Sequence, residues 1–118
     1  MRRNFRNFTV WQSAIEFATE IYEITEAFPS HERFGLTSQI QRAAVSISSN
    51  IAEGSARSSD AEFSRFLEIA LGSAFEVESQ LIIADRLNYL PQPKFEKISE
   101  RLTFIQKQIN AFITKLKN

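Results

Sequence analysis

Residues 95–116 read "FEKISERLTFIQKQINAFITKL", and the spacing of their apolar positions decides the fold class. The apolar side chains recur at alternating steps of three and four: Phe95, Ile98, Leu102, Ile105, Ile109, Phe112 and Leu116. This spacing places them on one face of an α-helix. A sustained seven-residue repeat predicts left-handed, coiled-coil-like packing against other helices. We therefore expect a helix over residues 93–116 within an all-α protein.

Three further helices are expected upstream, over residues 10–28, 36–55 and 60–87. Each carries apolar residues at helical spacing, and no stretch gives a competing strand signal. Short loops between long helices favour an up-down-up-down antiparallel four-helix bundle. A length of 118 residues favours one domain spanning residues 1–118. We expect residues 1–8 and the last few residues to be mobile unless a partner orders them.

Turn and capping residues set these boundaries. Pro29 disfavours helical geometry at Phe28 and is expected to end the first helix there. Asn88 can adopt the left-handed conformation that ends helices. Possible capping boxes, in which two side chains satisfy free backbone donors, are formed by Thr9 with Gln12 and by Ser59 with Glu62.

The helix expected at residues 60–87 is apolar on more than one side. Beyond its main face, one side is extended by Leu71, Phe75 and Ile82, and Ile69, Ile83 and Leu87 lie nearly opposite that extension. A helix that is apolar on several sides must be buried on several sides, and three partner helices do not cover all of it. We therefore expect a homo-oligomer with Phe75 and Ile83 at contacts between copies. A thick monomeric core is the alternative.

The composition limits the classes of function. Fourteen Lys and Arg balance fourteen Asp and Glu, whereas proteins that bind nucleic acid by bulk electrostatics usually show a basic excess. The absence of cysteine excludes disulfides and thiol chemistry and fits a cytoplasmic location. No apolar segment follows the basic N-terminus, and none approaches the roughly 20 residues of a membrane span. We expect neither a signal peptide nor a membrane partner.

Charge is segregated along the neutral chain. Residues 1–10 and 94–118 are basic, whereas residues 11–32 and 60–93 are acidic. Such helices can attract each other within a molecule or between copies, although solvated faces without a partner explain the pattern equally well. Arg42 and Arg57 are candidates for phosphate contacts, and equally for ion pairs with Glu53 or with an acidic helix of a neighbouring copy. The candidates for contacts with RNA or DNA are Arg2, Arg3, Arg6, Arg42, Arg57, Lys94, Lys97, Arg101 and Lys107.

The sequence offers no constellation that supports catalysis. His31 is the only histidine and lies in a polar loop, so neither a catalytic triad nor a zinc site is expected. No glycine-rich phosphate loop is present. Glu78 and Asp85 lie at the edge of an apolar helix face, where we expect each to hydrogen-bond a Ser, Asn or Arg of another helix. We predict no catalytic residue, no metal and no cofactor, and no enzyme activity.

Residues 42–59, "RAAVSISSNIAEGSARSS", are rich in small side chains. Small side chains allow two helix backbones to approach closely, which predicts a helix–helix interface with a few hydrogen bonds.

Four segments point to a family: "VWQSAIEFATEIYEIT", "FPSHERFGLTSQIQRAAVSISSNIAEGSAR", "EFSRFLEIALGSAFEVESQL" and "LNYL". Their order and spacing closely resemble the bacterial four-helix-bundle proteins related to the 23S ribosomal RNA intervening-sequence protein. Ser49, Asn50 and Glu53 match the family signature, and we interpret them as structural or interfacial. Ser48 stands where the family usually has Pro, which would remove a helix irregularity, and Asn88 stands where Gly is frequent.

The resemblance implies a bundle that assembles into a homopentamer. It also implies kinship with the accessory variability proteins of diversity-generating retroelements, which resemble basic pentamers that bind nucleic acid and a reverse transcriptase. The zero net charge of this chain departs from that pattern. Our hypothesis is a non-enzymatic homo-oligomer that binds RNA or another nucleic acid weakly. The alternative is a protein–protein scaffold or accessory protein with a polypeptide partner.

Overall fold

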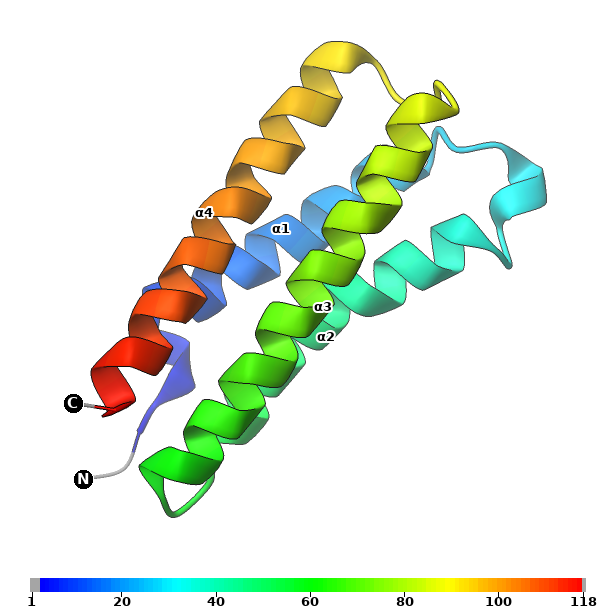
Figure 1. The fold of residues 1–118 in the computed structure, drawn as a ribbon. Helices are drawn as coiled ribbons and strands as arrows, with labels where there is room; N and C mark the ends of the chain where they lie inside the picture. Colours follow the sequence, from blue (N-terminus) through cyan, green and yellow to red (C-terminus); the bar gives the residue numbers. More distant parts are fainter. Residues whose placement is uncertain (1–2, 118) are drawn as a thin grey trace.

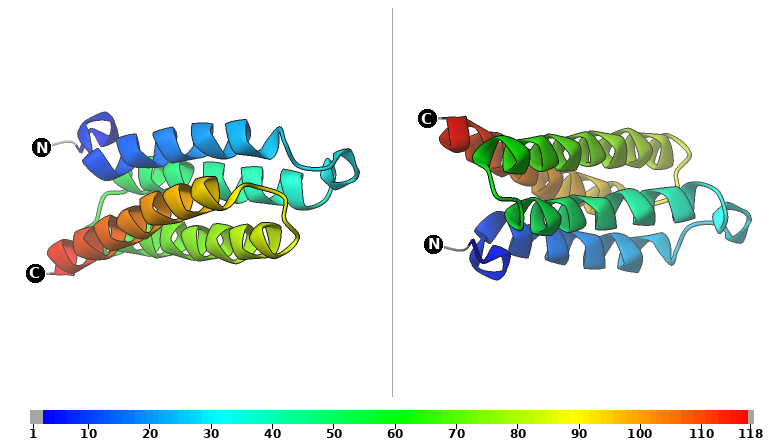
Figure 2. Two further views of the ribbon diagram at one scale, coloured as in Figure 1. Left: turned by 90° about the horizontal axis from the view of Figure 1, so that it is seen from above. Right: turned by 90° about the horizontal axis from the view of Figure 1, so that it is seen from below.

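The computed structural model describes residues 3–117, which form four α-helices, two short 3-10 helices and no strand. The elements are η1 (Phe5–Asn7), α1 (Thr9–Thr25), η2 (Ser30–Glu32), α2 (Leu36–Ser55), α3 (Asp60–Arg86) and α4 (Gln92–Lys117). The four long helices lie side by side (Figures 1 and 2). Both chain ends and the α2–α3 connection lie at one end, and the other two connections lie at the opposite end (Figure 1). The prediction of an all-α, four-helix fold is confirmed.

The apolar repeat of α4 supplies one side of the core. Ile98, Leu102, Ile105 and Ile109 are at most 2% exposed, and the remaining members of the repeat pack against the same cluster. All four α-helices contribute to this cluster, so it runs along the whole bundle. The heptad spacing therefore predicted correctly which face of α4 is buried.

The first helix is shorter than the predicted range of residues 10–28, because α1 ends at Thr25. The Thr25 hydroxyl donates to backbone carbonyl oxygens of the preceding turn, and the next three amides make short-range turn bonds. This turn places Phe28 in a small buried cluster with Leu90. Because Pro29 also disfavours helical geometry at Phe28, the chain leaves the helix before that residue. The other three helices match their predicted bounds to within one residue at each end.

The predicted capping box of Thr9 and Gln12 is wrong. α1 begins at Thr9 after an uncapped Phe8, and the Gln12 side chain donates to the carbonyl oxygen of Arg6 at 2.9 Å. The turn formed by η1 brings that carbonyl within reach, so Gln12 ties the N-terminal segment to α1 instead of capping the helix.

The prediction that Asn88 ends α3 in the left-handed conformation is confirmed. Of the capping box predicted for Ser59 and Glu62, only the bond to the Ser59 hydroxyl is formed. The Ser59 hydroxyl accepts a hydrogen bond from the amide of Glu62 at 3.1 Å, although the Glu62 side chain does not return it. Asn88 has a φ of 61°, and beyond it the amide of Tyr89 donates to the carbonyl of Ala84 at 2.9 Å. This bond pattern is that of a Schellman motif, which needs a residue in the left-handed region.

The N-terminal segment is packed on the bundle, in contrast to the mobility that we expected. The ring of Phe8 lies 6.1 Å from that of Phe63 and 5.1 Å from that of Phe112, measured between centroids. These contacts join the residue that precedes α1 to α3 and α4 at the end that carries the termini. Arg2, one of the candidate nucleic-acid contacts, lies outside the described residues.

Within residues 3–117, every helix falls short of the length and hydropathy that a membrane crossing requires.

Candidate interaction surfaces

The small residues of α2 form a close seam with α3. The hydroxyls of Ser46 and Ser73 lie 2.9 Å apart, and the Asn50 amide donates to the Ser46 hydroxyl at 2.9 Å and to its carbonyl oxygen at 2.8 Å. The predicted helix–helix interface is confirmed, although within residues 3–117 a single side-chain hydrogen bond crosses it, that of Ser46 with Ser73. Asn50 belongs to this seam, whereas Ser49 and Glu53 are exposed on α2.

The substitution at Ser48 leaves no irregularity in α2, which is continuous from Leu36 to Ser55. The buried Ser48 hydroxyl donates to the carbonyl oxygen of Val45 at 3.1 Å. A serine can make this bond within a regular helix, whereas a proline would remove a backbone donor.

The outer face of α3 carries two apolar flanks that the packing of residues 3–117 leaves about half exposed. Phe75 and Ile82 form the flank nearer α4, and Ile69, Ile83 and Leu87 form the flank nearer α2. These five side chains are between 40% and 52% exposed. At about 100° per residue, Gly72 lies between the two flanks, and a Cβ built there would meet nothing within 4 Å. We refer to these six residues as the α3 outer face.

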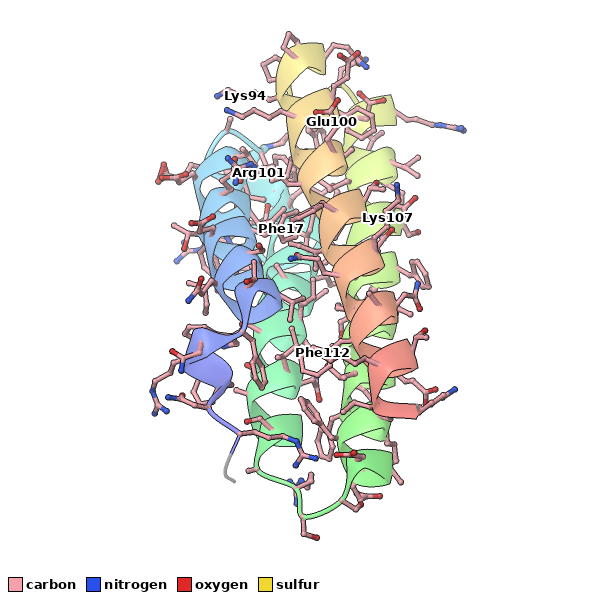
Figure 3. All side chains as sticks on the ribbon, turned by 90° about the vertical axis from the view of Figure 1, so that its left-hand side faces the viewer. Phe17, Lys94, Glu100, Arg101, Lys107 and Phe112 are labelled. Carbon is pink, nitrogen blue, oxygen red and sulfur yellow. The ribbon has the colours of Figure 1, made fainter. Side chains whose placement is uncertain are left out.

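The basic residues of α4 face the acidic residues of α1. Arg101 Nε lies 3.0 Å from an oxygen of Glu20, and one Nη of Arg101 lies 4.0 Å from Glu16. Lys94 and Lys97 line a groove together with Glu20 and a second α1 glutamate. Figure 3 shows Lys94, Arg101 and Lys107 distributed along α4. Of the three possibilities left open by the charge pattern, attraction within the molecule holds for Arg101 of α4 with Glu16 and Glu20 of α1.

Four arginines gather at the end of the bundle that carries the termini, and each packs on a phenylalanine ring. The guanidinium carbons of Arg3 and Arg6 lie 4.9 Å from the Phe63 centroid and 4.5 Å from the Phe5 centroid, respectively. The guanidinium carbons of Arg57 and Arg65 lie 4.7 and 4.8 Å from the same ring, that of Phe66. We call this set the Arg–Phe end: Arg3, Arg6, Arg57, Arg65, Phe5, Phe63 and Phe66.

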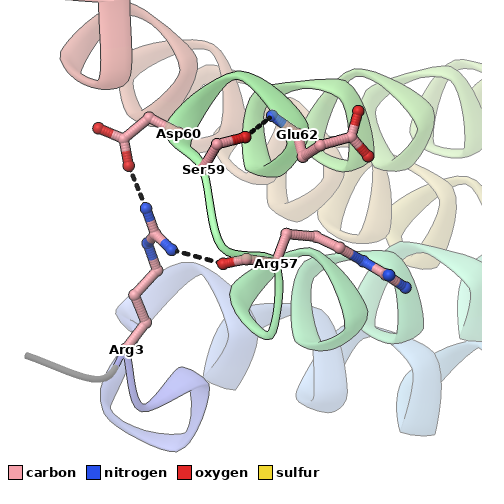
Figure 4. Close-up of polar contacts among 5 residues, drawn as sticks. All are labelled: Arg3, Arg57, Ser59, Asp60 and Glu62. Atoms are coloured by element: carbon pink, nitrogen blue, oxygen red, sulfur yellow. Dashed lines mark hydrogen bonds and ion pairs between the residues drawn. The ribbon is translucent and has the colours of Figure 1, made fainter.

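The side chains of the Arg–Phe end have different roles. Arg3 donates to a carboxylate oxygen of Asp60 and, at 3.0 Å, to the carbonyl oxygen of Arg57 (Figure 4). Arg3 therefore holds the N-terminal segment against the α2–α3 connection. The side chain of Arg57 extends away from Arg3 (Figure 4). Neither Arg6 nor Arg57 is ion-paired with a carboxylate of residues 3–117, so the ion pair considered for Arg57 with Glu53 is not formed.

The remaining basic candidates are isolated. Arg42 donates to the hydroxyl of Ser38 at 3.4 Å, and Lys107 is exposed on α4. Arg42 lies in α2 and Lys107 lies in α4, and neither belongs to the Arg–Phe end. The structure thus brings together three of the nine predicted basic candidates, Arg3, Arg6 and Arg57.

The polar cluster around His31 connects two parts of the chain that are distant in the sequence. Glu32 accepts hydrogen bonds from the Leu36 amide at 3.0 Å and from the Tyr89 hydroxyl at 2.9 Å. The Leu36 bond, followed by the Tyr89 bond, lowers the pKa of Glu32, and the bond to Glu32 raises the pKa of Tyr89. His31 lies exposed beside them, 3.5 Å from the Tyr89 hydroxyl. The cluster joins η2 to the α3–α4 turn.

The two carboxylates singled out in α3 differ from each other. Glu78 accepts a hydrogen bond from Gln106 of α4 at 2.8 Å, so it does pair with another helix, although through Gln and not through Ser, Asn or Arg. Asp85 is half-buried and makes no side-chain hydrogen bond within residues 3–117. Across the described part of the chain, no three His, Cys, Asp or Glu side chains are grouped as metal ligands.

Comparison with protein families gives a match over most of the chain. The family of the 23S rRNA-intervening sequence protein matches residues 6–111. The chain belongs to this family. No curated protein matches it.

A solved structure supports membership of the 23S rRNA-intervening sequence protein family. It is described as a protein with unknown function from the S23 ribosomal protein family, from Bacteroides thetaiotaomicron. The two chains are 31% identical, with a TM-score of 0.82, and the match covers 89% of this chain and 95% of the other. The resemblance inferred from the sequence motifs is therefore confirmed, and the four-helix fold is shared.

In this family member, sequence reasoning missed Arg65 at the Arg–Phe end. Arg65 lies in an acidic segment, and its carboxylate neighbour Glu62 lies 3.4 Å away, so its charge does not stand out in the sequence. A signal was present nonetheless, because Phe66 follows it directly and Arg57 lies in the adjoining turn. The Arg65–Phe66 pair, a few residues after Arg57, would have suggested the cluster.

Proposed function

We propose that this chain is a non-enzymatic, up-down-up-down bundle that associates with copies of itself, and that the assembly binds RNA. The homopentamer implied by the family resemblance is the proposed assembly, and the cytoplasm is the proposed location. The self-association rests on the α3 outer face. The RNA binding rests on the Arg–Phe end.

The α3 outer face supports self-association because its exposure has no explanation within one chain. Burying an apolar side chain completely contributes about 1.5–3 kcal/mol, so covering the exposed halves of five such residues favours association. Gly72 in a helix interior costs about 0.5–1 kcal/mol relative to alanine, and no neighbour within residues 3–117 requires it. A close approach by another backbone between the two flanks would require a residue this small.

Light scattering after size-exclusion chromatography tests the assembly. The wild-type mass is expected to be several times the 13.6 kDa of one chain. Gly72→Glu is the sharpest variant, because it has room within the chain and should leave the bundle folded while lowering the mass. Asn110→Glu, on an exposed position of α4, is the matched control and should keep the wild-type mass. A monomeric wild type at micromolar concentration overturns the proposal.

Two further variants place a charge directly on the flanks. Phe75→Asp and Ile83→Asp should reduce the mass of the assembly, because an unpaired charge would be forced into an apolar contact. If both variants keep the parent mass and melting temperature, these residues face solvent in the assembly, and the α3 outer face is not the contact.

RNA binding is supported by the arginines that carry no ion pair at the Arg–Phe end. The net charge of zero does not oppose local binding, because Arg6 and Arg57 have no carboxylate partner within residues 3–117. A labelled, structured RNA titrated at low salt should bind, and affinity should fall steeply with salt as counterions are released. No binding at tens of micromolar, or salt-insensitive binding, overturns this part of the proposal.

A protein scaffold is the second candidate, and Phe34 is the observation that favours it. Phe34 is 88% exposed in the connection between α1 and α2, with the Arg33 guanidinium 5.2 Å from its ring centroid. Exposed aromatic residues beside arginine are typical anchors of protein interfaces. A nuclease-treated pull-down that returns one protein stoichiometrically with the wild type, and not with Phe34→Ser, would favour this candidate over RNA binding.

A further inference from the structure

We infer that the RNA bound by this protein is a single strand that crosses the Arg–Phe end, with one nucleotide in the groove between η1 and the last turn of α2. This inference rests on the RNA binding proposed above and assigns it a site and a partner class. Three observations support this inference. They are the dimensions and lining of the groove, the absence of an ion pair at Arg6 and Arg57 within residues 3–117, and the packing of all four arginines of the Arg–Phe end on phenylalanine rings.

The groove is large enough for a nucleotide. Its volume is about 750 Å³, within the range of about 300–1,000 Å³ that is typical of small-ligand sites. One wall is Phe5 and Arg6 of η1, and the other is Ala52 and Ser55 of α2 with Ala56, the residue that follows this helix. The lining therefore combines apolar surface, hydroxyl groups and a cation. A nucleotide presents the matching features, because it joins a planar base to an anionic phosphate.

Arg6 is placed to bind that phosphate. Its guanidinium stacks on Phe5, and its polar contact with Asn4 is a long one, at 3.4 Å. Stacking occupies one face of the guanidinium and leaves donors in its plane, which match the oxygens of a phosphate as a two-pronged pair. No carboxylate of the described residues competes for Arg6 by ion pairing.

Arg57 and Arg65 extend the cationic surface around the α2–α3 connection. The Arg57 side chain runs along the bundle away from Arg3 (Figure 4), and Phe66 holds it beside Arg65. The cations are thus spread over the end of the bundle and do not converge on one point. A row of phosphates along a strand fits this spread, whereas one isolated phosphate would use only a part of it.

The aromatic support favours a single strand over a duplex. The bases of a single strand can stack on arginine planes and aromatic rings, whereas a duplex keeps its bases paired and inaccessible. Of the acids around the site, Asp60 is paired with Arg3 and Glu62 is paired with Arg65. Glu53, one turn before Arg57, and Glu68, which lines a groove with Arg65, form no ion pair within residues 3–117. Arg3 is a positioning residue, because its donors are occupied by Asp60 and the Arg57 carbonyl.

The test compares two double variants of the full chain. Fluorescence anisotropy would measure binding of a labelled 20-nucleotide RNA without self-complementarity, and of the same RNA as a duplex. Arg6→Gln with Arg57→Gln should weaken single-strand binding by about tenfold or more and reduce the salt slope by about 1.4, since each lost phosphate contact in a single strand contributes about 0.7. Lys94→Gln with Lys97→Gln removes the same charge outside the site and should change affinity less than twofold. The single strand should bind more tightly than the duplex.

The outcomes separate the site from the function. If the wild type binds neither RNA, the proposed RNA binding is wrong. If it binds and both double variants weaken it equally, RNA binding stands and the site assignment is wrong. Tighter binding of the duplex contradicts the single-strand assignment.

Two further measurements examine the groove and the role of the guanidinium. Adenosine 5′-monophosphate should bind the wild type at millimolar concentration by NMR titration and lose that binding in Arg6→Gln. No binding to the wild type, or equal binding to both proteins, overturns the assignment of a nucleotide to the groove. Arg6→Lys with Arg57→Lys keeps the charge and should give intermediate RNA affinity. Circular dichroism melting of every variant checks that a loss of RNA binding is not caused by unfolding. Because Arg6 and Arg57 are exposed, their substitution should leave the melting temperature unchanged.

Discussion

A Cβ atom placed on Gly54 of α2 would lie 2.7 Å from the Cβ of Phe66 on α3, and 2.9 Å from a ring carbon of Phe63. Both distances are shorter than real Cβ contacts, so the two helices pass closer at this point than a side chain on residue 54 would allow. The same contact positions Phe66, on which Arg57 and Arg65 stack. Gly54 thus connects the packing of the seam with the geometry of the Arg–Phe end.

We predict that Gly54→Ala lowers the free energy of unfolding by about 1–3 kcal/mol, because overpacking forces backbone shifts in a tight seam. Urea denaturation would measure the effect. Ser49→Ala, on an exposed position of the same helix, is the control and should stay within about 0.5 kcal/mol of the wild type. Equal stability of Gly54→Ala and the wild type would mean that α2 and α3 separate there without cost.

The hydrogen-bond chain of the seam is expected to be cooperative. Ser46→Ala removes the hydroxyl that contacts both Ser73 and Asn50. We predict that it lowers the free energy of unfolding by about 1–3 kcal/mol, because a partner group is left without its hydrogen bond. Ser46→Ala combined with Ser73→Ala should cost less than the sum of the two single variants. A double-mutant cycle in urea checks this, and strict additivity would indicate that the two hydroxyls do not interact.

The contact between Glu32 and Tyr89 predicts the pH dependence of stability. Hydrogen bonds hold the pKa of Glu32 below its ordinary value of 4.5, so its contribution is present above that pH and is lost as pH falls through the lowered pKa. The pKa of Tyr89 is raised above 10.0, so its contribution is present below that pH and is lost as pH rises through the raised value.

Glu32→Gln should therefore flatten the acid side of the melting-temperature profile, and Tyr89→Phe should flatten the alkaline side. Thermal melts over the full pH range check both effects. Glu26→Gln, on an exposed carboxylate of the neighbouring turn, is the control and should retain the wild-type profile. An unchanged acid limb in Glu32→Gln would show that other carboxylates cause the acid loss.

The sequence predicted the helices well because their apolar repeats are local. The α4 repeat needs only its own spacing to identify the buried face, and Asn88 needs only its own backbone preference to end α3. The end of α1 could not be predicted in the same way, because the burial of Phe28 depends on Leu90, which lies far away in the sequence. The packing of Phe8 on Phe63 and Phe112 is equally non-local.

The candidate site was predictable in its residue types and not in its grouping. Counting charges identified Arg6 and Arg57, but it gave the same weight to Lys94 and Lys97. The packing of α1 on α4 places those lysines in a groove with Glu20 and Glu23, whereas Arg6 and Arg57 lie at the end of the bundle without a carboxylate partner within residues 3–117. Local charge balance in the folded chain, and not the total, decides which cations are free to bind an anion.

The pairing of α1 with α4 leads to the last prediction. If the acids of α1 neutralise the basic face of α4, removing them should create a second cationic surface. Glu20→Gln combined with Glu23→Gln leaves Lys94 and Lys97 opposite neutral side chains and frees Arg101 from its closest partner. We expect several-fold tighter RNA binding at low salt, with a gain that shrinks at higher salt as exposed charges are screened.

The same variant should remain folded, because a partly exposed ion pair contributes about 0–1 kcal/mol. Glu26→Gln combined with Asp85→Asn, at the end of the bundle away from the Arg–Phe end, removes the same charge elsewhere and serves as the control. A larger gain from the α1 variant than from this control indicates that specific cations on α4 have been released. An equal gain would mean that total charge alone governs RNA affinity, and it would contradict the local pairing on which the assignment of the Arg–Phe end depends.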